Sequence, residues 1–285
     1  MADLYKDIIS GTDSIATKVN ADGAFFVAAD YDETGDASPI TVGQENVYLH
    51  FAPGATLTKQ LTCSETHVTL HVEPGATLGD VELQGPYNKV RIDPGGLISQ
   101  LSATVLTGVA GVQVQGLGRG SKINLVATDV SDHDDFRLEM MGLDSSTNQT
   151  LNGERVQAIC CTIAGNGAIL PGLSRREHYY RGCIFTEGAG QRIFGRMERS
   201  RLSANTFIAA SSRGLYADGT TFDNNMVNAL LVDGLTTTVA AELKASNNDN
   251  HLYGCILRGP VGGSSLGYTD AGTGNRWTHI LNPTS

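Results

Sequence analysis

A six-residue stretch that recurs in the first third of the chain constrains the fold more than any other feature. It reads APGATL at 52–57, EPGATL at 73–78 and, more loosely, DPGGLI at 93–98. Successive Pro-Gly pairs are therefore 21 and then 20 residues apart. A period of this length, with strand-like residues in every copy, is typical of a solenoid.

The residues before each Pro-Gly pair predict the strands of this solenoid. NVYLHF, HVTLHV and NKVRI alternate apolar and polar side chains, as strands with one buried face do. Proline then ends the strand because it donates no hydrogen bond to a neighbouring strand, and glycine permits the sharp bend. We predict an all-β chain that forms a single parallel β-helix, in which the repeated stretch turns the same corner in successive coils.

A second repeat occupies the later part of the chain. CTI, CIF, NTF, NMV and CIL each place a small polar or sulfur-bearing residue before a β-branched or apolar pair. We expect the leading residues to stack in one column, where asparagines hydrogen-bond from coil to coil and cysteines fill the same position. The predicted ladder consists of Cys161, Cys183, Asn205, Asn225 and Cys255.

These repeats predict three segments in one elongated domain. The parallel β-helix spans 44–258, and 259–285 is a loop with a final capping strand, whose Trp277 covers the end of the core. Residues 1–43 form an N-terminal cap or attachment segment, because the open strand edges of a solenoid need covering. Four apolar residues are spaced to share one face of a short attachment helix. They are Leu4, Tyr5, Ile8 and Ile9.

Composition excludes several classes of function. A net charge of −10 argues against general attraction to nucleic acid or to anionic membranes. The five cysteines include no Cys-x-x-Cys pair, so neither a disulfide framework nor a zinc site is expected. The N-terminus lacks the apolar region of a signal peptide, and no stretch approaches the length of a membrane span. GLGRGS at 116–121 precedes a strand-like segment rather than a helix, so we predict a corner and no cofactor.

Two groups of aspartates are candidates for chemistry. The segment DVSDHDD at 129–135 contains Asp129, Asp132, Asp134 and Asp135. A solvated loop is the favoured interpretation, while a Ca²⁺ site and a pair of catalytic carboxylates for glycoside hydrolysis are the alternatives. The segment YADGTTFDNN makes a weaker case. The weak catalytic candidates are Asp132, Asp134, Asp218 and Asp223, and we assign no catalytic residue and no metal.

Arginines are concentrated between 175 and 213, where eight of the fourteen occur. Coils of 20 to 22 residues would bring them together with the tyrosines of LSRREHYYRG. Arginine and tyrosine are enriched at protein interfaces, and arginine suits anionic groups, so we predict a protein interface or contact with an anionic saccharide. Pairing with nearby glutamates is the alternative. The predicted surface comprises Arg175, Arg176, Tyr179, Tyr180, Arg181, Arg196, Arg199 and Arg201.

The PGATL corners, the Asn/Cys ladder and the segment GLGRGSKINL also carry a resemblance. Over roughly residues 45–258, the chain resembles the right-handed parallel β-helix superfamily of pectate and pectin lyases. More narrowly, it resembles the β-helical tailspikes and related proteins of bacteriophage virions. The resemblance implies a homotrimer on the virion surface, attached to other virion proteins through its N-terminal segment. Such spikes bind, and sometimes cleave, bacterial surface polysaccharide. The calcium-and-arginine constellation of pectate lyases has no counterpart here.

Three functional hypotheses follow. The favoured one is a non-enzymatic virion protein, either a short trimeric tailspike or a capsid decoration protein, which explains the short chain and the arginine-rich surface. The alternative is a polysaccharide-degrading lyase or glycoside hydrolase, which release of fragments would reveal. A cellular adhesive or structural β-helix protein is the third, and copy number in a purified particle separates it from the first.

Overall fold

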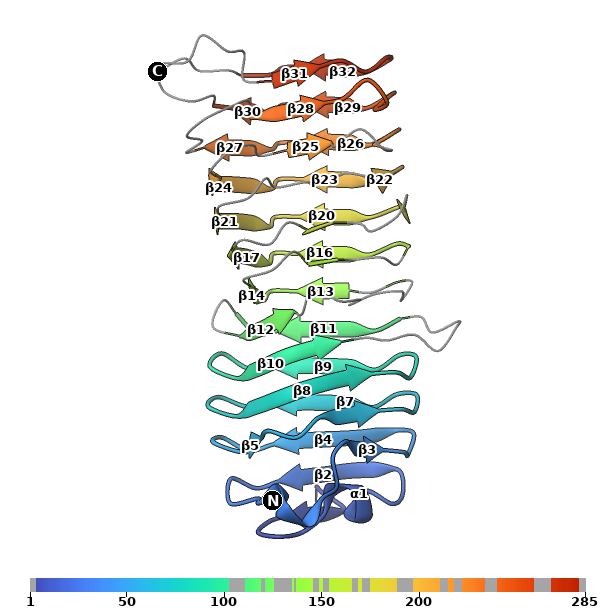
Figure 1. The fold of residues 1–285 in the computed structure, drawn as a ribbon, viewed down its shortest axis with the longest axis vertical. Helices are drawn as coiled ribbons and strands as arrows, with labels where there is room; N and C mark the ends of the chain where they lie inside the picture. The colour runs from blue at the N-terminus through green and yellow to red at the C-terminus, as the bar shows by residue number, and fades with distance from the viewer. Residues whose placement is uncertain are drawn as a thin grey trace. The chain divides into compact units, whose positions relative to one another are not determined.

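The protein is nearly all β-structure, and the predicted fold class is confirmed (Figure 1). A computed structural model describes residues 4–102, 111–118, 121–125, 135, 137–145, 149–150, 154–165, 169–170, 175–188, 197–210, 215–217, 222–233, 240–258 and 268–281. The chain divides into two compact units, Met1–Leu143 and Asp144–Ser285. Each is a parallel β-solenoid, with strands between Asp7 and Thr278.

The first unit contains two parallel sheets in which strands pair in chain order. Sheet 1A consists of β1 (Asp7–Ile9), β2 (Gly23–Val27), β4 (Val47–Phe51), β7 (Thr69–Val72), β9 (Lys89–Ile92), β11 (Gln113–Gly116) and β13 (Arg137–Glu139). Sheet 1B consists of β3 (Ile40–Val42), β6 (Leu61–Cys63), β8 (Thr77–Leu83), β10 (Leu97–Ser102), β12 (Lys122–Leu125) and β14 (Gly142–Ser145), with β5 (Thr56–Leu57) paired to β8. Each coil thus contributes one strand to each sheet.

The second unit follows the same plan. Sheet 2A consists of β16 (Gln157–Ile159), β20 (Tyr179–Arg181), β23 (Arg201–Ser203), β26 (Met226–Asn228), β29 (His251–Tyr253) and β32 (Arg276–Thr278). Sheet 2B consists of β17 (Thr162–Gly165), β21 (Ile184–Gly188), β24 (Thr206–Ala210), β27 (Leu231–Asp233) and β30 (Ile256–Leu257). Smaller sheets are formed by β15 (Gln149–Thr150) with β18 (Ile169–Leu170), by β19 (Arg175–Arg176) with β22 (Met197–Glu198), and by β25 (Leu215–Ala217), β28 (Ala241–Leu243) and β31 (Tyr268–Asp270).

Stacked inward-facing side chains form the core, as the alternating pattern predicted. Leu49, Leu70 and Val90 occupy the same register position of three neighbouring strands, and all are buried. The intervening residues of these strands face outward. Since parallel strands lie about 4.8 Å apart, such columns keep apolar side chains in continuous contact from coil to coil.

The Pro-Gly stretches turn the same corner in successive coils, which confirms their structural interpretation. Gly54, Gly75 and Gly95 have φ angles of +81°, +79° and +92°, a region that side chains disfavour. The N–H of Gly75 donates to the carbonyl of Gly95 at 3.0 Å, so the corners of neighbouring coils are hydrogen-bonded to each other.

The N-terminal segment is arranged differently from the prediction. The expected helix with Leu4, Tyr5, Ile8 and Ile9 on one face is wrong, because Asp7–Ile9 is strand β1, paired with β2. The strand alternation buries Ile9 and leaves Ile8 46% exposed, while Leu4 is 77% exposed. A role of these residues in attachment stays a prediction, as do the domain boundaries.

A single turn of helix does occur in this segment, but further along the chain. Helix α1 (Ile15–Lys18) packs near β1 and β3, and a 3₁₀ turn covers Glu33–Gly35. None of the helices in the described ranges is long and apolar enough to cross a membrane.

Trp277 lies on the last strand of sheet 2A, where it is paired in register with buried Leu252. Its ring stacks on Tyr268 with centroids 4.1 Å apart, and its indole N–H donates to Asp270 Oδ2 at 2.6 Å. This position is in line with the expectation that Trp277 covers the end of the core.

Candidate functional site

Three predicted surface residues lie together on the outer face of sheet 2A. Strands β20 and β23 are paired so that Tyr179 lies opposite Arg201, and Arg181 opposite Ser203. The alternation leaves Arg181 and Arg201 exposed and Tyr179 partly exposed. Neighbouring parallel strands are about 4.8 Å apart, so two cations and an aromatic ring share a small area.

Arg199 adds a third exposed cation at the corner that leads into β23. Its φ of 49° turns the chain, and its N–H donates to the carbonyl of Asp223 at 3.0 Å. We call Tyr179, Arg181, Arg199 and Arg201 the Arg/Tyr surface.

The three guanidinium groups of the Arg/Tyr surface have no ion-pair partner among the residues that the structure describes. Elsewhere on the outer faces, Arg137 pairs with Glu139, and Arg91 Nε lies 3.7 Å from Asp93 Oδ1. The alternative in which glutamates neutralise these arginines therefore has no support at Arg181, Arg199 and Arg201. Their charge is available to an external anion.

Tyr180 does not belong to this surface, and its prediction was wrong. Strand alternation turns its side chain into the core opposite Leu202, and the residue is completely buried. Its hydroxyl lies 3.1 Å from Nδ1 of His178, which is also buried. Burial raises the pKa of Tyr180 far above its ordinary value, so the hydroxyl stays protonated.

The other predicted arginines are only partly described. Arg175 and Arg176 form strand β19 and pair with Met197 and Glu198 of β22, which places their backbone in the coils of the Arg/Tyr surface. Arg196 lies outside the described residues.

The weak catalytic candidates remain predictions. Asp132, Asp134 and Asp218, together with Asp129, lie outside the described residues. Asp223 Oδ1 accepts the backbone N–H of Asn248 at 2.6 Å, which gives this carboxylate a structural role in a turn. Within the described ranges, no group of three or more His, Cys, Asp or Glu side chains is arranged to hold a metal ion.

Part of the predicted ladder occurs in the second unit. Cys161, Cys183 and Asn205 follow one another in a column of backbone hydrogen bonds, and Asn205 Oδ1 accepts the N–H of Cys183 at 3.0 Å. The column continues through Leu230 to Cys255. The assignment of Asn225 to this column was wrong, because Leu230 holds the equivalent position before β27.

Asn225 belongs instead to a second ladder. We did not predict this ladder, because the spacing of the repeat placed Asn225 in the first one. Ser200 Oγ accepts a hydrogen bond from the backbone N–H of His178. In the same way, Asn225 Oδ1 accepts one from the N–H of Ser200, and Asn250 Oδ1 accepts one from the N–H of Asn225. These three distances are 2.8–3.0 Å. Asn275 Oδ1 then accepts the N–H of Asn250 at 2.9 Å. The 25-residue spacing of these three asparagines is the sequence signal that could have revealed this ladder.

A cluster of ionisable side chains on the outer face of sheet 1A was also missed. Its centre is a pair of stacked imidazoles, His50 and His71, with centroids 4.5 Å apart and ring planes 12° apart. Each imidazole lies between a tyrosine hydroxyl and a carboxylate. We call the arrangement the histidine pair.

The first half of the histidine pair connects Tyr5, His50 and Glu73. The hydroxyl of Tyr5 is hydrogen-bonded to His50 Nδ1, and His50 Nε2 lies 2.5 Å from Glu73 Oε1. The ring of Tyr5 also packs on Phe26 with centroids 5.2 Å apart. A neutral imidazole satisfies both partners when Nε2 carries the proton, since Nδ1 then accepts the tyrosine O–H.

The second half repeats the arrangement one coil further on. The hydroxyl of Tyr48 lies 2.7 Å from His71 Nδ1, and His71 Nε2 lies 3.2 Å from Asp93 Oδ1. The latter contact is an ion-pair distance without hydrogen-bond geometry. Burial is the main cause that lowers the pKa of His71, while Asp93 opposes the shift. The sequence signal was the recurrence of His at the same position of the PGATL repeat.

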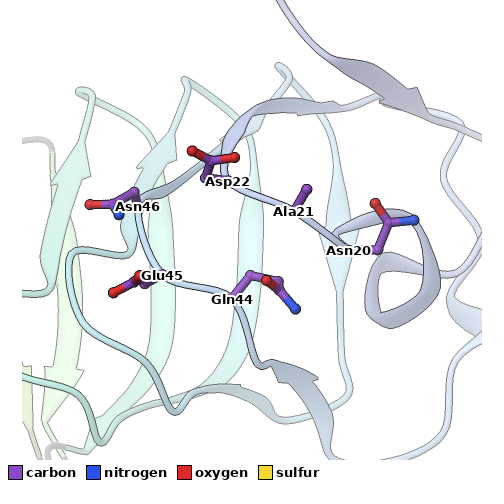
Figure 2. Close-up of a pocket in the computed structure, with 6 residues that line it drawn as sticks. All are labelled: Asn20, Ala21, Asp22, Gln44, Glu45 and Asn46. Carbon is purple, nitrogen blue, oxygen red and sulfur yellow. The ribbon is translucent and has the colours of Figure 1, made fainter.

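A polar hollow of about 320 Å³ lies between two loops of the first unit (Figure 2). Asn20, Ala21 and Asp22 line it from one loop, and Gln44, Glu45 and Asn46 from the other. Two carboxylates in an open hollow do not by themselves specify a ligand.

Comparison with known proteins does not extend these observations. No protein-family model, no curated protein and no solved structure matches the chain.

Proposed function

We propose that the protein is a non-enzymatic component of a bacteriophage virion surface, either a short trimeric tailspike or a capsid decoration protein. In this proposal, the Arg/Tyr surface contacts an anionic polysaccharide of the host bacterium. The observation that carries it is the position of Arg181 and Arg201 on neighbouring strands, exposed and without an ion-pair partner among the described residues.

The chemistry of the Arg/Tyr surface suits such a ligand. A guanidinium group donates paired hydrogen bonds in a planar fork that matches carboxylate and phosphate groups. Tyr179, opposite Arg201, offers an aromatic ring with a polar end. A polysaccharide repeats its anionic groups along a chain, as the coils of a solenoid repeat along their stack.

The scaffold supports recognition by a rigid surface. Side-chain ladders and backbone hydrogen bonds join neighbouring coils of the second unit, so side chains on its outer face are held at fixed spacing. A pre-organised surface loses less conformational entropy when it binds.

Substitution of the two arginines tests the proposal. The Arg181→Ser/Arg201→Ser variant should bind an acidic bacterial polysaccharide at least tenfold more weakly than the unaltered protein in biolayer interferometry, because charge-assisted hydrogen bonds are lost. Arg137→Ser is the matched control, since Arg137 also begins an outward-facing strand but is paired with Glu139.

Unchanged affinity of the double variant for a polysaccharide that the protein binds would refute the role of the Arg/Tyr surface. Equal loss of affinity in the Arg137→Ser variant would show that the affinity depends on the overall charge of the protein and not on the position of Arg181 and Arg201. Both variants should keep the thermal unfolding temperature of the unaltered protein, because exposed side chains contribute little to stability.

The trimer is a separate part of the proposal, supported by the resemblance of the repeats to tailspikes. Sedimentation equilibrium at micromolar concentration should give three times the 30.1 kDa mass of one chain. A monomeric mass would contradict the trimer without affecting the glycan contact.

A further inference from the structure

The outer face of sheet 2A continues beyond the Arg/Tyr surface into the later coils of the second unit. The middle residues of β20, β23, β26 and β29 are buried, so the residues on either side of them face outward. The strand register arranges these outward-facing residues in two columns, which we call the extended face. The first column consists of Tyr179, Arg201, Met226, His251 and Arg276. The second column consists of Arg181, Ser203, Asn228, Tyr253 and Thr278.

We propose that the extended face binds one acidic polysaccharide chain that runs along the stack of coils. Arg181 and Arg201 hold an anionic group at one end of this face, and Arg276 holds another at the other end. Tyr253 packs on a sugar ring between them. The inference rests on the proposed glycan contact, and it adds the direction of the chain and a second group of contact residues.

The charge of the extended face favours a polyanion. None of the six strands of sheet 2A contains an aspartate or glutamate, although the whole chain has 30 of these residues. Arg276 is exposed and, like Arg181 and Arg201, has no ion-pair partner in the described part of the chain. A row of unpaired cations without carboxylates attracts anionic groups.

The position of the carboxylates indicates the direction of the ligand. Glu177 and Asp249 are exposed at the corner that precedes the strands of sheet 2A. A polyanion that followed β20 or β29 to this corner would meet one of these carboxylates, and like charges repel. A chain that follows the columns from coil to coil stays on the face where the strands carry only arginines as fixed charges.

The spacing of the arginines sets the spacing of the acidic groups. Arg201 and Arg276 are separated by three strand steps, through Met226 and His251. Since neighbouring strands lie about 4.8 Å apart, the two positions are about 14 Å apart along the stack. One sugar of an extended polysaccharide has a length similar to one strand step. The extended face therefore suits acidic groups that lie about three sugars apart.

Tyr253 offers an aromatic surface between the two ends. It lies on β29, and its side chain is 49% exposed. His279 packs against its ring with centroids 5.3 Å apart and ring planes at 83°, and His251 packs at 6.3 Å and 73°. These contacts hold the ring in place while about half of it stays accessible. An aromatic face of this kind packs on the C–H groups of a sugar, and its hydroxyl can bond to a sugar oxygen.

Heparin oligosaccharides of defined length test the extended face by isothermal titration calorimetry at low salt. The unaltered protein should bind an octasaccharide at least tenfold more tightly than a disaccharide, because only the longer chain reaches from the Arg/Tyr surface to Arg276. Arg276→Ser and Tyr253→Ala should each weaken binding of the octasaccharide at least threefold. Both should change the affinity for the disaccharide less than twofold, because the Arg/Tyr surface still holds it.

Arg258→Ser is the matched control. Arg258 is exposed and directly follows β30 of sheet 2B, so the variant removes the same charge from the second unit but leaves the extended face intact. The affinity for both oligosaccharides should stay within twofold of that of the unaltered protein. An octasaccharide affinity that fell as far in Arg258→Ser as in Arg276→Ser would overturn the extended face, because overall charge would then account for the loss.

The remaining outcomes separate this inference from the proposed function. If Arg181→Ser/Arg201→Ser weakened binding while Arg276→Ser and Tyr253→Ala left the octasaccharide affinity unchanged, the extended face would be overturned and the glycan contact would stand. If the unaltered protein bound neither oligosaccharide at low salt, the glycan contact itself would be overturned, and the extended face with it. Tighter binding of a single-stranded DNA of equal charge would overturn a polysaccharide as the ligand.

Discussion

Asn250 Oδ1 accepts the backbone N–H of Asn225, 25 positions earlier, at 3.0 Å. Its side-chain N–H donates to the carbonyl of Phe222 at 2.5 Å. Both asparagines are buried, so water cannot replace these bonds. A buried amide that bonds to the backbone of the preceding coil holds neighbouring coils together where the chain turns.

The ladder predicts a large effect of Asn250→Ala. The substitution leaves the N–H of Asn225 and the carbonyl of Phe222 unsatisfied inside the core, so the free energy of unfolding should fall by about 3 kcal/mol. Urea denaturation followed by the fluorescence of Trp277 measures this change. Thr269→Ala, at an exposed position of β31, should change the free energy by less than about 0.5 kcal/mol. Equal stability of the two variants would contradict a structural role of the ladder.

A buried carboxylate organises the N-terminal segment. Asp36 accepts hydrogen bonds from the Ser14 and Tyr31 hydroxyls and from the N–H groups of Ile15 and Ala16, at 2.5–3.1 Å. Asp36→Ala should lower the free energy of unfolding of the first unit by about 3 kcal/mol, because charge-assisted bonds are among the strongest. Asp32→Ala, which removes only an exposed turn contact at Thr34, is the comparison and should cost far less.

Asp36 also predicts the response to acid. Burial by itself raises the pKa of Asp36, but the four hydrogen bonds outweigh it and hold the pKa below the ordinary 3.8. The stabilisation is therefore complete above pH 3.8 and is lost as the pH falls through the lower folded-state value. Thermal unfolding between pH 2 and pH 5 should show this acid loss, and the Asp36→Ala variant should show less of it. An equal loss in both proteins would assign the effect to other carboxylates.

Substitution by alanine should lower the stability of the protein by different amounts at two glycines. A Cβ at buried Gly85 would overlap the carbonyl of Glu65, so Gly85→Ala should cost about 2–3 kcal/mol of stability through backbone displacement. A Cβ at Gly54 meets nothing within 4 Å, and only its φ of +81° is unfavourable, so Gly54→Ala should cost about 1 kcal/mol. Chemical denaturation of both variants measures the difference. A larger loss of stability in Gly54→Ala than in Gly85→Ala would contradict this prediction.

The five cysteines should react with a thiol reagent at different rates, because they differ in exposure to solvent. Cys160 is exposed, whereas the other four are buried, and burial raises the pKa of Cys63 to about 12. Hydrogen bonding to Cys161 lowers the pKa of Cys183, but both lie inside the core. A thiol reagent at pH 8 should therefore modify one thiol per folded chain and five after unfolding. Rapid modification of a Cys160→Ser variant would contradict this arrangement.

The regular features of the fold could be predicted because they repeat. The Pro-Gly corners recur with nearly constant spacing, and the alternation of apolar residues identified buried positions such as Leu49 and Leu70. The N-terminal strand could not be predicted in the same way, because the spacing of Leu4, Tyr5, Ile8 and Ile9 fits one face of a helix, whereas a strand places Ile8 and Ile9 on opposite faces. Pairing of Asp7–Ile9 with the edge of β2 decides between the two, and this edge exists only in the folded sheet.

The corners of the second unit were beyond prediction for another reason. Glu177, Arg199, Asn224 and Asp249 all have φ near +50° to +65°, and each N–H donates to a carbonyl of the next coil. Residues with side chains disfavour this conformation, and no shared residue type marks it. Coil-to-coil hydrogen bonds offset the strain. The change of coil length from 22 to 25 residues also moved Asn225 out of its predicted column.

The exposure of the predicted surface residues could be inferred from the sequence only in part. The density of arginines revealed Arg181 and Arg201, since charge alone indicates exposure. Tyr180 was misassigned because strand alternation, rather than residue type, decides which tyrosine of the pair faces the core. The histidine pair was missed because its side chains come from separate coils, spread along the chain from Tyr5 to Asp93.

We propose above that the Arg/Tyr surface contacts an anionic glycan and that the protein does not cleave it. Incubation of the protein with a panel of acidic and neutral bacterial surface polysaccharides, with measurement of both binding and new chain ends, tests the two parts of this proposal together. We expect the protein to bind an acidic polysaccharide, more weakly when salt is added, and to produce no new chain ends. Release of fragments would contradict the non-enzymatic role, and binding that ignores both the charge of the polysaccharide and added salt would contradict recognition through the Arg/Tyr surface.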